Sequence, residues 1–215
     1  MLRYAPLLLA LACAGEFIQH IAEVSIGMFA SREAFVALQG SPLRMGFGLA
    51  KVAALLVTVA WTARWLAHRN RAERPGLDGP IDWGRLLLPM LITIGALITV
   101  TQAPIGSRQV RLALLGAVLL VSLPWSRMAM DALFGRPRES LGKALRRRPM
   151  PPIGGLLAIL PVAAAMYLHT RNHTWAFAAQ PSAVWALMAW DALLVAGLTG
   201  WLGALTYRFY QPAAA

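Results

Sequence analysis

Long runs of apolar residues, separated by short polar segments, dominate the sequence. A helix needs about 20 such residues to cross the hydrocarbon core of a bilayer. Six runs reach or approach that length, and they cover residues 4–29, 45–66, 86–103, 110–134, 153–169 and 182–207. No segment alternates apolar and polar residues with the period of two that a membrane β-barrel requires. The pattern predicts an all-α polytopic membrane protein, with residues 1–215 forming a single bundle of six transmembrane helices.

The first run also has features of a secretory signal peptide. Arg3 precedes an apolar stretch, and Ala12-Cys13-Ala14 resembles a cleavage site between small residues. The apolar run continues past this point to residue 29, which favours an uncleaved spanning helix; cleavage within residues 1–14 stays open as the alternative. Because Cys13 is the only cysteine, an internal disulfide framework and any Cys-pair metal or redox motif are excluded.

The composition agrees with the apolar runs. Hydrophobic residues make up 58% of the chain, charged residues make up 13%, and the mean hydropathy is +0.58. An average globular domain has roughly 25% charged residues and about 45–50% apolar ones. A soluble domain, a disordered chain and a nucleic-acid-binding module are therefore excluded as classes, although the net charge of +11 alone would suggest nucleic acid.

The basic residues instead indicate membrane topology. One side of the expected membrane holds fourteen Lys and Arg residues and the other side holds five. Because cytoplasmic loops carry the excess of positive charge, both termini are expected in the cytoplasm, in a bacterial inner (plasma) membrane. The basic loops, with Arg146, Arg147 and Arg148 in sequence, also suit contact with anionic lipids on the cytoplasmic side.

Five ionisable residues fall inside the expected spans: Glu16, His20 and Glu23 in the first, Lys51 in the second and Asp191 in the sixth. Glu16, His20 and Glu23 lie at i, i+4 and i+7, so they share one helix face. At ~1.5 Å per residue, all five fall in one layer of the outer half of the bilayer. Ionisable groups at this depth cost several kcal/mol unless they are paired or hydrated, so they form a functional hypothesis by default.

Two more candidates lie at the outer end of the fifth run. His169 and His173 are spaced i, i+4 and could share a face if the helix continues that far. With Glu16, His20 and Glu23 they form a candidate ligand set for a transition metal ion (zinc, iron or copper). The simpler interpretation is a pair of interfacial histidines near water. Asn172-His173-Thr174 also matches a glycosylation sequon.

Three functions compete for these residues. In the first, Glu16, His20, Glu23 and Asp191 bind a metal or relay protons in a membrane oxidoreductase or small transporter, and Lys51 balances their charge. In the second, the chain is an accessory or assembly subunit of a larger membrane complex, and the same charges only fix helix packing. In the third, His20 and His169 are axial ligands of a b-type haem, although their estimated depths differ by about 5–7 Å. The chain has no nucleophile elbow, P-loop or Cys-x-x-Cys motif.

Overall fold

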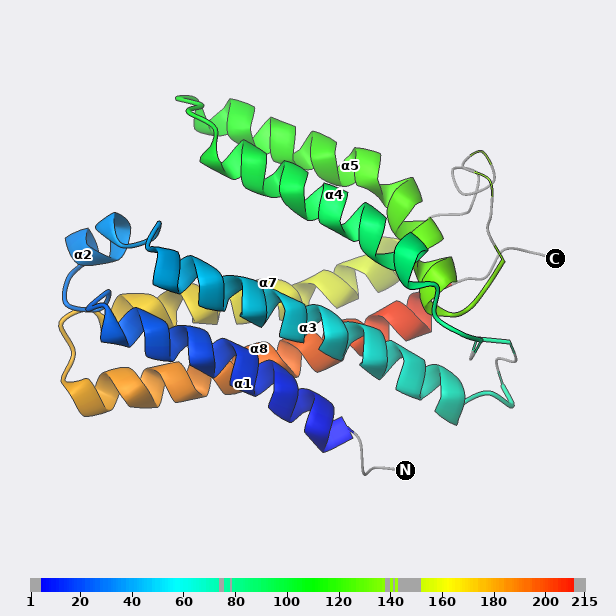
Figure 1. Cartoon of the computed structure of the whole chain (residues 1–215), viewed down its shortest axis with the longest axis horizontal. Coiled ribbons are helices and arrows are strands. Elements are labelled where there is room, and N and C mark those ends of the chain that lie inside the picture. The colour runs from blue at the N-terminus through cyan, green and yellow to red at the C-terminus, as the bar shows by residue number, and fades with distance from the viewer. Residues whose placement is uncertain are drawn as a thin grey trace. The chain divides into compact units, whose positions relative to one another are not determined.

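The computed structural model describes residues 5–73, 76–77, 79–137, 140, 142 and 152–210. The described part of the chain is helical and contains no strand, which confirms the all-α class (Figure 1). Its helices are α1 (Ala5–Ser25), α2 (Arg32–Ala37), α3 (Pro42–Arg69), α4 (Trp83–Gln102), α5 (Arg108–Leu133), α7 (Pro152–Ala176) and α8 (Pro181–Phe209).

Among the residues that the structure describes, three helices are long and apolar enough to cross a bilayer: Pro6–Ser25 within α1, Pro42–Arg69 and Pro181–Arg208. Two shorter apolar helical stretches, Trp83–Leu97 and Gln109–Ser122, lie in α4 and α5. The chain is thus helical with several candidate membrane spans. The count of six spans, the cytoplasmic termini and the single domain stay predictions.

Two helix ends differ most from the sequence-based expectation. The first helix ends at Ser25 and not at residue 29, because residues 26–29 form a turn in which Gly27 has a φ of +76°. Only glycine adopts this left-handed conformation readily, so it ends helices and reverses the chain. The fifth run continues as helix from residue 169 to Ala176. His169 and His173 therefore lie on one continuous helix.

The short helix α2 follows that turn. Ser31 is its N-cap, and the Ser31 hydroxyl oxygen accepts a hydrogen bond from the backbone N–H of Ala34 at 3.1 Å. Hydrogen bonds from its own backbone N–H and from the Ser31 hydroxyl hold the pKa of Glu33 below its usual value. No residue of α2 is fully buried. The helix thus lies on the surface of the molecule, as an interfacial helix would.

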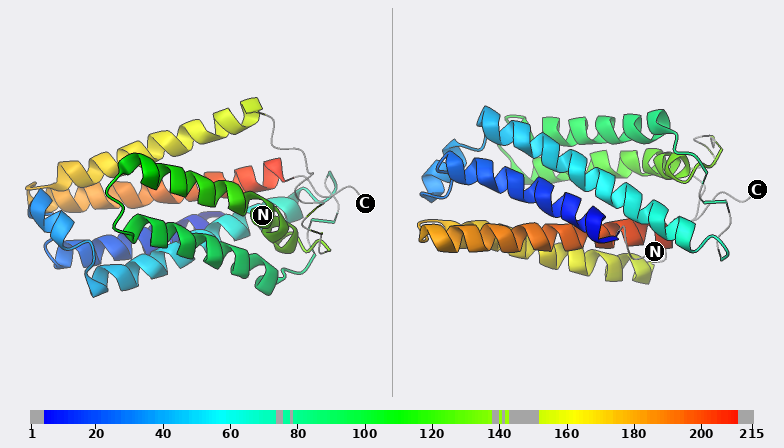
Figure 2. Two further views of the ribbon diagram at one scale, coloured as in Figure 1. Left: turned by 90° about the horizontal axis from the view of Figure 1, so that it is seen from above. Right: turned by 60° about the horizontal axis from the view of Figure 1, so that its bottom comes forward.

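The chain divides into two compact units. The first consists of Met1–Leu66 and Met150–Phe209, and the second of Ala67–Pro149 and Tyr210–Ala215. Within the first unit, α8 packs against α1 on one side and against α7 on the other (Figure 2). This unit therefore joins α1 from the beginning of the sequence and α8 from its end in one helical bundle.

Small residues allow the helices of the first unit to approach closely. A Cβ atom at Gly15 of α1 would lie 2.7 Å from the Ala54 Cβ of α3. A Cβ atom at Gly203 of α8 would lie 2.6 Å from the Thr62 Cβ of α3. Such contacts are closer than any larger residue permits, and they are typical of helix pairs that pack in a membrane.

The second unit is built around the α4–α5 hairpin. Asp82 and Ser107 cap the two helices through their side-chain oxygens. Asp131, near the end of α5, is 2% exposed and accepts a hydrogen bond from the Tyr210 hydroxyl. None of the candidate site residues lies in this unit.

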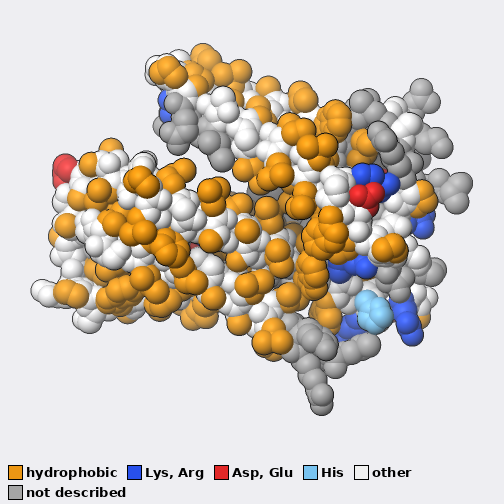
Figure 3. Space-filling model, viewed as in Figure 1, with side chains coloured by type: hydrophobic (Ala, Val, Ile, Leu, Met, Phe, Trp, Pro, Cys, Tyr) orange, Lys and Arg blue, Asp and Glu red, His pale blue; other side chains and the backbone are white. Residues whose placement is uncertain are grey.

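Large apolar side chains cover the outside of both units. Leu91 and Ile92 of α4 are more than 60% exposed, as are Leu120 and Val121 of α5. On the face shown in Figure 3, hydrophobic side chains cover the bodies of the helices, and charged side chains gather toward their ends. Apolar surface on this scale is unfavourable in water and is typical of proteins that contact lipid.

Candidate metal centre

All seven candidate site residues converge in the first unit. Glu16, His20 and Glu23 come from α1, Lys51 from α3, His169 and His173 from α7, and Asp191 from α8. The three acids and His20 are 0% exposed. The structure therefore brings these residues together from four helices, whereas the layer of the bilayer expected for Glu16, His20, Glu23, Lys51 and Asp191 stays a prediction.

Asp191 is the centre of the cluster. Its Oδ2 atom lies 3.0 Å from His20 Nε2 and 2.6 Å from His169 Nδ1. Its Oδ1 atom accepts a hydrogen bond of 2.7 Å from the Asn172 side-chain amide. One buried carboxylate thus joins α8 to both α1 and α7.

His20 contacts a carboxylate through each ring nitrogen. Nε2 lies 3.0 Å from Asp191 Oδ2 and 3.4 Å from Glu16 Oε1, whereas Nδ1 lies 2.9 Å from Glu23 Oε2. The spacing along α1 produces this arrangement, because side chains at i, i+3, i+4 and i+7 stack on one helix face. The imidazole is thereby held in one orientation, with acidic groups on both sides.

Glu23 is held by two further residues. The Gln19 amide donates a hydrogen bond of 2.7 Å to Glu23 Oε1, and Arg44 Nε donates one of 3.0 Å to the same oxygen. Arg44 also donates from Nη1 to the backbone oxygen of Gln39, at 3.0 Å. The side chain of Arg44 is 23% exposed, so it lies between the buried cluster and the surface.

Lys51 pairs with Glu16 across the α1–α3 contact. Lys51 Nζ donates a hydrogen bond of 2.7 Å to Glu16 Oε1. The pair forms where Gly15 lets the helices meet, since a Cβ atom at Gly15 would lie 3.5 Å from the Lys51 Cα atom. The glycine therefore places the ammonium group inside the cluster.

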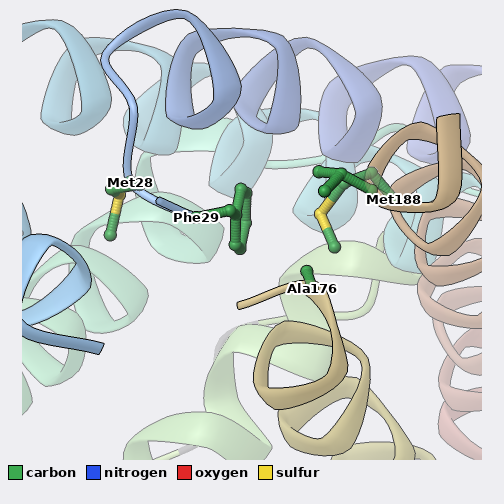
Figure 4. Packing of buried hydrophobic residues seen from close by; sticks show 5 residues of the cluster. Met28, Phe29, Ala176 and Met188 are labelled. Atoms are coloured by element: carbon green, nitrogen blue, oxygen red, sulfur yellow. The ribbon is translucent and has the colours of Figure 1, made fainter. Parts of the chain in front are cut away.

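His173 is surrounded by rings. Its centroid lies 4.6 Å from that of His169, 5.5 Å from that of His20 and 5.7 Å from that of Phe29. Phe29 belongs to a buried apolar group that also includes Met28, Ala176, Val184 and Met188 (Figure 4). This group closes the end of the cluster that lies next to α2.

Three buried polar atoms of the cluster have no hydrogen-bond partner among the described residues: Glu16 Oε2, Asn172 Oδ1 and His173 Nε2. Nearly all buried polar atoms in proteins are hydrogen-bonded, so each exception needs an explanation, such as an ion or a water. Here the exceptions lie within a group of metal-ligating side chains. A carboxylate oxygen and a ring nitrogen with free lone pairs are the donors that a transition metal uses.

The spacing of the donor atoms fits a metal ion. Three sets of side chains each place one ligand atom per residue within 4.8 Å of the others: Glu16, His20 and Asp191; His20, Glu23 and His173; and His169, His173 and Asp191. With bonds of roughly 2.0–2.1 Å, tetrahedral ligand atoms lie about 3.3 Å apart. His20 Nε2 is already 3.0 Å from Asp191 and 3.4 Å from Glu16. The buried charged residues can therefore hold a metal ion with small side-chain shifts.

The charges of the cluster nearly cancel. Glu16, Glu23 and Asp191 carry three negative charges, and Lys51 and Arg44 carry two positive ones. With neutral imidazoles, one negative charge is left over. A buried excess charge is costly, so the cluster favours an added cation: one proton would neutralise it, whereas a divalent metal ion would leave one positive charge.

Sequence reasoning missed two members of the cluster, Arg44 and Asn172. In the sequence, Arg44 is one of the five basic residues on the less basic side of the expected membrane, and its place at the start of the helix that carries Lys51 is the signal for it. Asn172 matched a glycosylation sequon, but it is 0% exposed and bonded to Asp191, so it is not available as a glycan acceptor. Its position one turn after His169 was the overlooked signal.

The geometry does not favour a haem. His20 Nε2 and His169 Nδ1 both contact the same oxygen of Asp191. Axial imidazoles lie on opposite faces of a porphyrin, with the iron between them. A carboxylate occupies that position here.

Comparison with known proteins adds no identity. No family model matches the sequence, and no curated protein or solved structure matches the chain. The functional argument therefore rests on the cluster itself.

Proposed function

We propose that this protein is an integral membrane protein that binds one divalent transition metal ion through Glu16, His20 and Asp191, with His169 as a fourth ligand. The observation that carries the proposal is the unpartnered, fully buried Glu16 Oε2 beside ligand atoms that already have metal-site spacing. Mixed imidazole and carboxylate donors suit zinc and iron, with copper as a further candidate.

The residues around these ligands support the proposal. Metal-bound histidines usually donate their second ring N–H to a carboxylate, which fixes the ring and increases its basicity. Glu23 Oε2 lies 2.9 Å from His20 Nδ1 and fills this role, and Gln19 and Arg44 hold Glu23 in turn. Asn172 orients Asp191 in the same way.

We further propose that the protein crosses the inner membrane six times, with both termini in the cytoplasm. The cluster would then lie in the outer half of the bilayer. A buried metal site at this depth suits either a small metal transporter or the metal centre of a membrane oxidoreductase. The accessory-subunit alternative, in which the charges only fix helix packing, is less well supported, since it gives no partner to the buried Glu16 Oε2, Asn172 Oδ1 and His173 Nε2 atoms.

Metal content is the direct test. Protein purified in detergent is loaded separately with Zn²⁺, Fe²⁺ or Cu²⁺, freed of excess metal and analysed by mass spectrometry of the elements. We expect about one ion per chain for one of these metals in the wild type, and a loss of that ion in His20→Ala and Asp191→Asn. The exposed Glu33→Gln variant is the control and should keep the ion. A folded wild type that retains none of the three metals would refute the proposal.

A proton relay is the second candidate. His169, Asp191, His20 and Glu23 form one continuous line of contacts between 2.6 and 3.0 Å. Groups spaced in this way can pass a proton between imidazoles and carboxylates. Metal-free protein in vesicles whose proton uptake stops on His20→Gln would favour this function over metal binding.

A further inference from the structure

Lys51 contacts the carboxylate that the proposed metal site depends on most. Its Nζ atom lies 2.7 Å from Glu16 Oε1, and His20 Nε2 lies 3.4 Å from that same oxygen. Only the Glu16 carboxylate thus separates the Lys51 ammonium group from the proposed metal position between Glu16, His20 and Asp191. A metal ion bound there would be a close neighbour of a fixed positive charge.

The charge balance of the cluster shows how Lys51 affects metal binding. Three carboxylates against Lys51 and Arg44 leave one negative charge when the imidazoles are neutral, as they must be when they bind metal. A divalent ion changes this excess to one positive charge. Without the charge of Lys51 the loaded cluster would be neutral. Like charges repel one another strongly in a low-dielectric interior, so the Lys51 ammonium group disfavours the metal-bound state of the cluster.

Lys51 stabilises the cluster when no metal ion is bound. Glu16 is 0% exposed, and a buried carboxylate without a counter-charge would be strongly destabilising. Lys51 supplies that counter-charge from α3. Its side chain is 17% exposed and unbranched, so it can withdraw from Glu16 when another cation arrives.

We propose that Lys51 is a tethered cation that competes with the metal ion for Glu16 and keeps the site exchangeable. This inference rests on the proposed function and assigns to the site a labile ion, one that is taken up and released, in place of a permanently held cofactor. A site of this kind suits transfer of a metal ion across or along the membrane. Lys51 is then the residue that sets the affinity.

The opposing interpretation is that Lys51 only fixes the packing of α1 on α3. The two interpretations predict opposite signs for loss of the charge. If Lys51 is only a packing residue, its removal disorders Glu16 and weakens metal binding. If Lys51 competes with the ion, its removal strengthens binding, because the ion no longer displaces or faces an ammonium group.

The experiment compares Zn²⁺ binding to detergent-purified wild type, Lys51→Met and Lys51→Gln. Affinity is measured by competition with a chromogenic zinc chelator, and release is measured by rapid mixing with an excess of a stronger chelator. We expect about tenfold or more tighter binding in both variants and slower release. Lys51→Arg keeps the charge and should stay near the wild type. Arg208→Met, which removes an exposed charge at the far end of α8, should have no effect.

Each outcome separates this inference from the proposed function. If the folded wild type binds no metal, the proposed function fails and the inference fails with it. If the wild type binds Zn²⁺ but Lys51→Met and Lys51→Gln bind it equally or more weakly, the metal site stands and the competition is refuted. Lys51→Gln keeps a hydrogen-bond donor at Glu16, so it tests the charge even if Lys51→Met does not fold.

Discussion

Replacing Asp191 with asparagine tests the centre of the cluster, because the two side chains have nearly the same size and differ in charge. Asp191 accepts contacts from His20, His169 and Asn172 at 3.0, 2.6 and 2.7 Å. An asparagine keeps one oxygen for Asn172 but turns an amide N–H₂ group toward the two imidazoles. The substitution therefore removes two bonds to a charged acceptor and takes the carboxylate away from His169, whereas His20 keeps Glu23 and Glu16.

The expected cost follows from these contacts. Hydrogen bonds to charged groups contribute roughly 1.5–3 kcal/mol each, so two of them amount to about 3–6 kcal/mol. Removing one partner of a buried ion pair costs about 3–5 kcal/mol, which agrees. At roughly 2–4 °C per kcal/mol for a chain of this length, Asp191→Asn should lower the melting temperature by about 10 °C.

The assay is thermal unfolding of the metal-free protein in detergent, monitored by tryptophan fluorescence. A charge swap provides the matched comparison. In Asp191→Asn combined with Asn172→Asp, the carboxylate moves to α7 and the amide moves to α8, so the pair is reversed across the same interface. We expect the double variant to recover a substantial part of the lost stability, since a buried carboxylate is restored at the same interface.

Two results would refute this reasoning. A melting temperature of Asp191→Asn within about 2 °C of the wild type would mean that the buried contacts contribute little. A double variant as unstable as the sum of both single variants would mean that the charge on Asp191 is not what holds α7 and α8 together. The exposed Glu33→Gln variant should melt with the wild type in either case.

Two further predictions concern packing and topology. Gly15→Ala places a Cβ atom 2.7 Å from the Ala54 Cβ and should cost about 1–3 kcal/mol of stability. Gly95→Ala has no neighbouring atom within 4 Å and should be neutral or stabilising by up to about 1 kcal/mol. Equal melting temperatures for the two variants would contradict the close α1–α3 contact. If the chain has six spans with both ends inside, a periplasm-active reporter inserted at Gly40 should be active and one fused after residue 215 inactive, and activity at both positions would rule out this topology.

The helices and the acidic stripe of α1 follow directly from the sequence. Apolar runs of spanning length have few alternatives to helix, because their backbone groups must be satisfied within the segment. The period of 3.6 residues then places Glu16, His20 and Glu23 on one face without any knowledge of the fold. Depth along each helix was also sufficient to group these residues with Lys51 and Asp191.

Partners across helices were harder to predict, because they depend on how each helix is rotated about its axis. Arg44 reaches Glu23 only because the chain reverses at Gly27 and returns through α2 into α3. Asn172 faces Asp191 because α7 continues as helix beyond residue 169. Hydrophobic spacing encodes neither the rotation of a helix about its axis nor its continuation beyond the apolar run. From the sequence alone, Arg44 and Asn172 therefore resemble ordinary loop or helix-end residues.

The first unit is assembled from helices at the two ends of the sequence, and this has a consequence for biosynthesis. When α1 leaves the ribosome, its two glutamates and its histidine have no counterpart from α8, and Asp191 is synthesised 168 residues after Glu23. During that interval the polar face of α1 must be shielded from lipid by the insertion machinery or by water. The unit can close only when the last helix arrives, so a nascent chain that stops before α8 should be recognised as unfinished by membrane quality control.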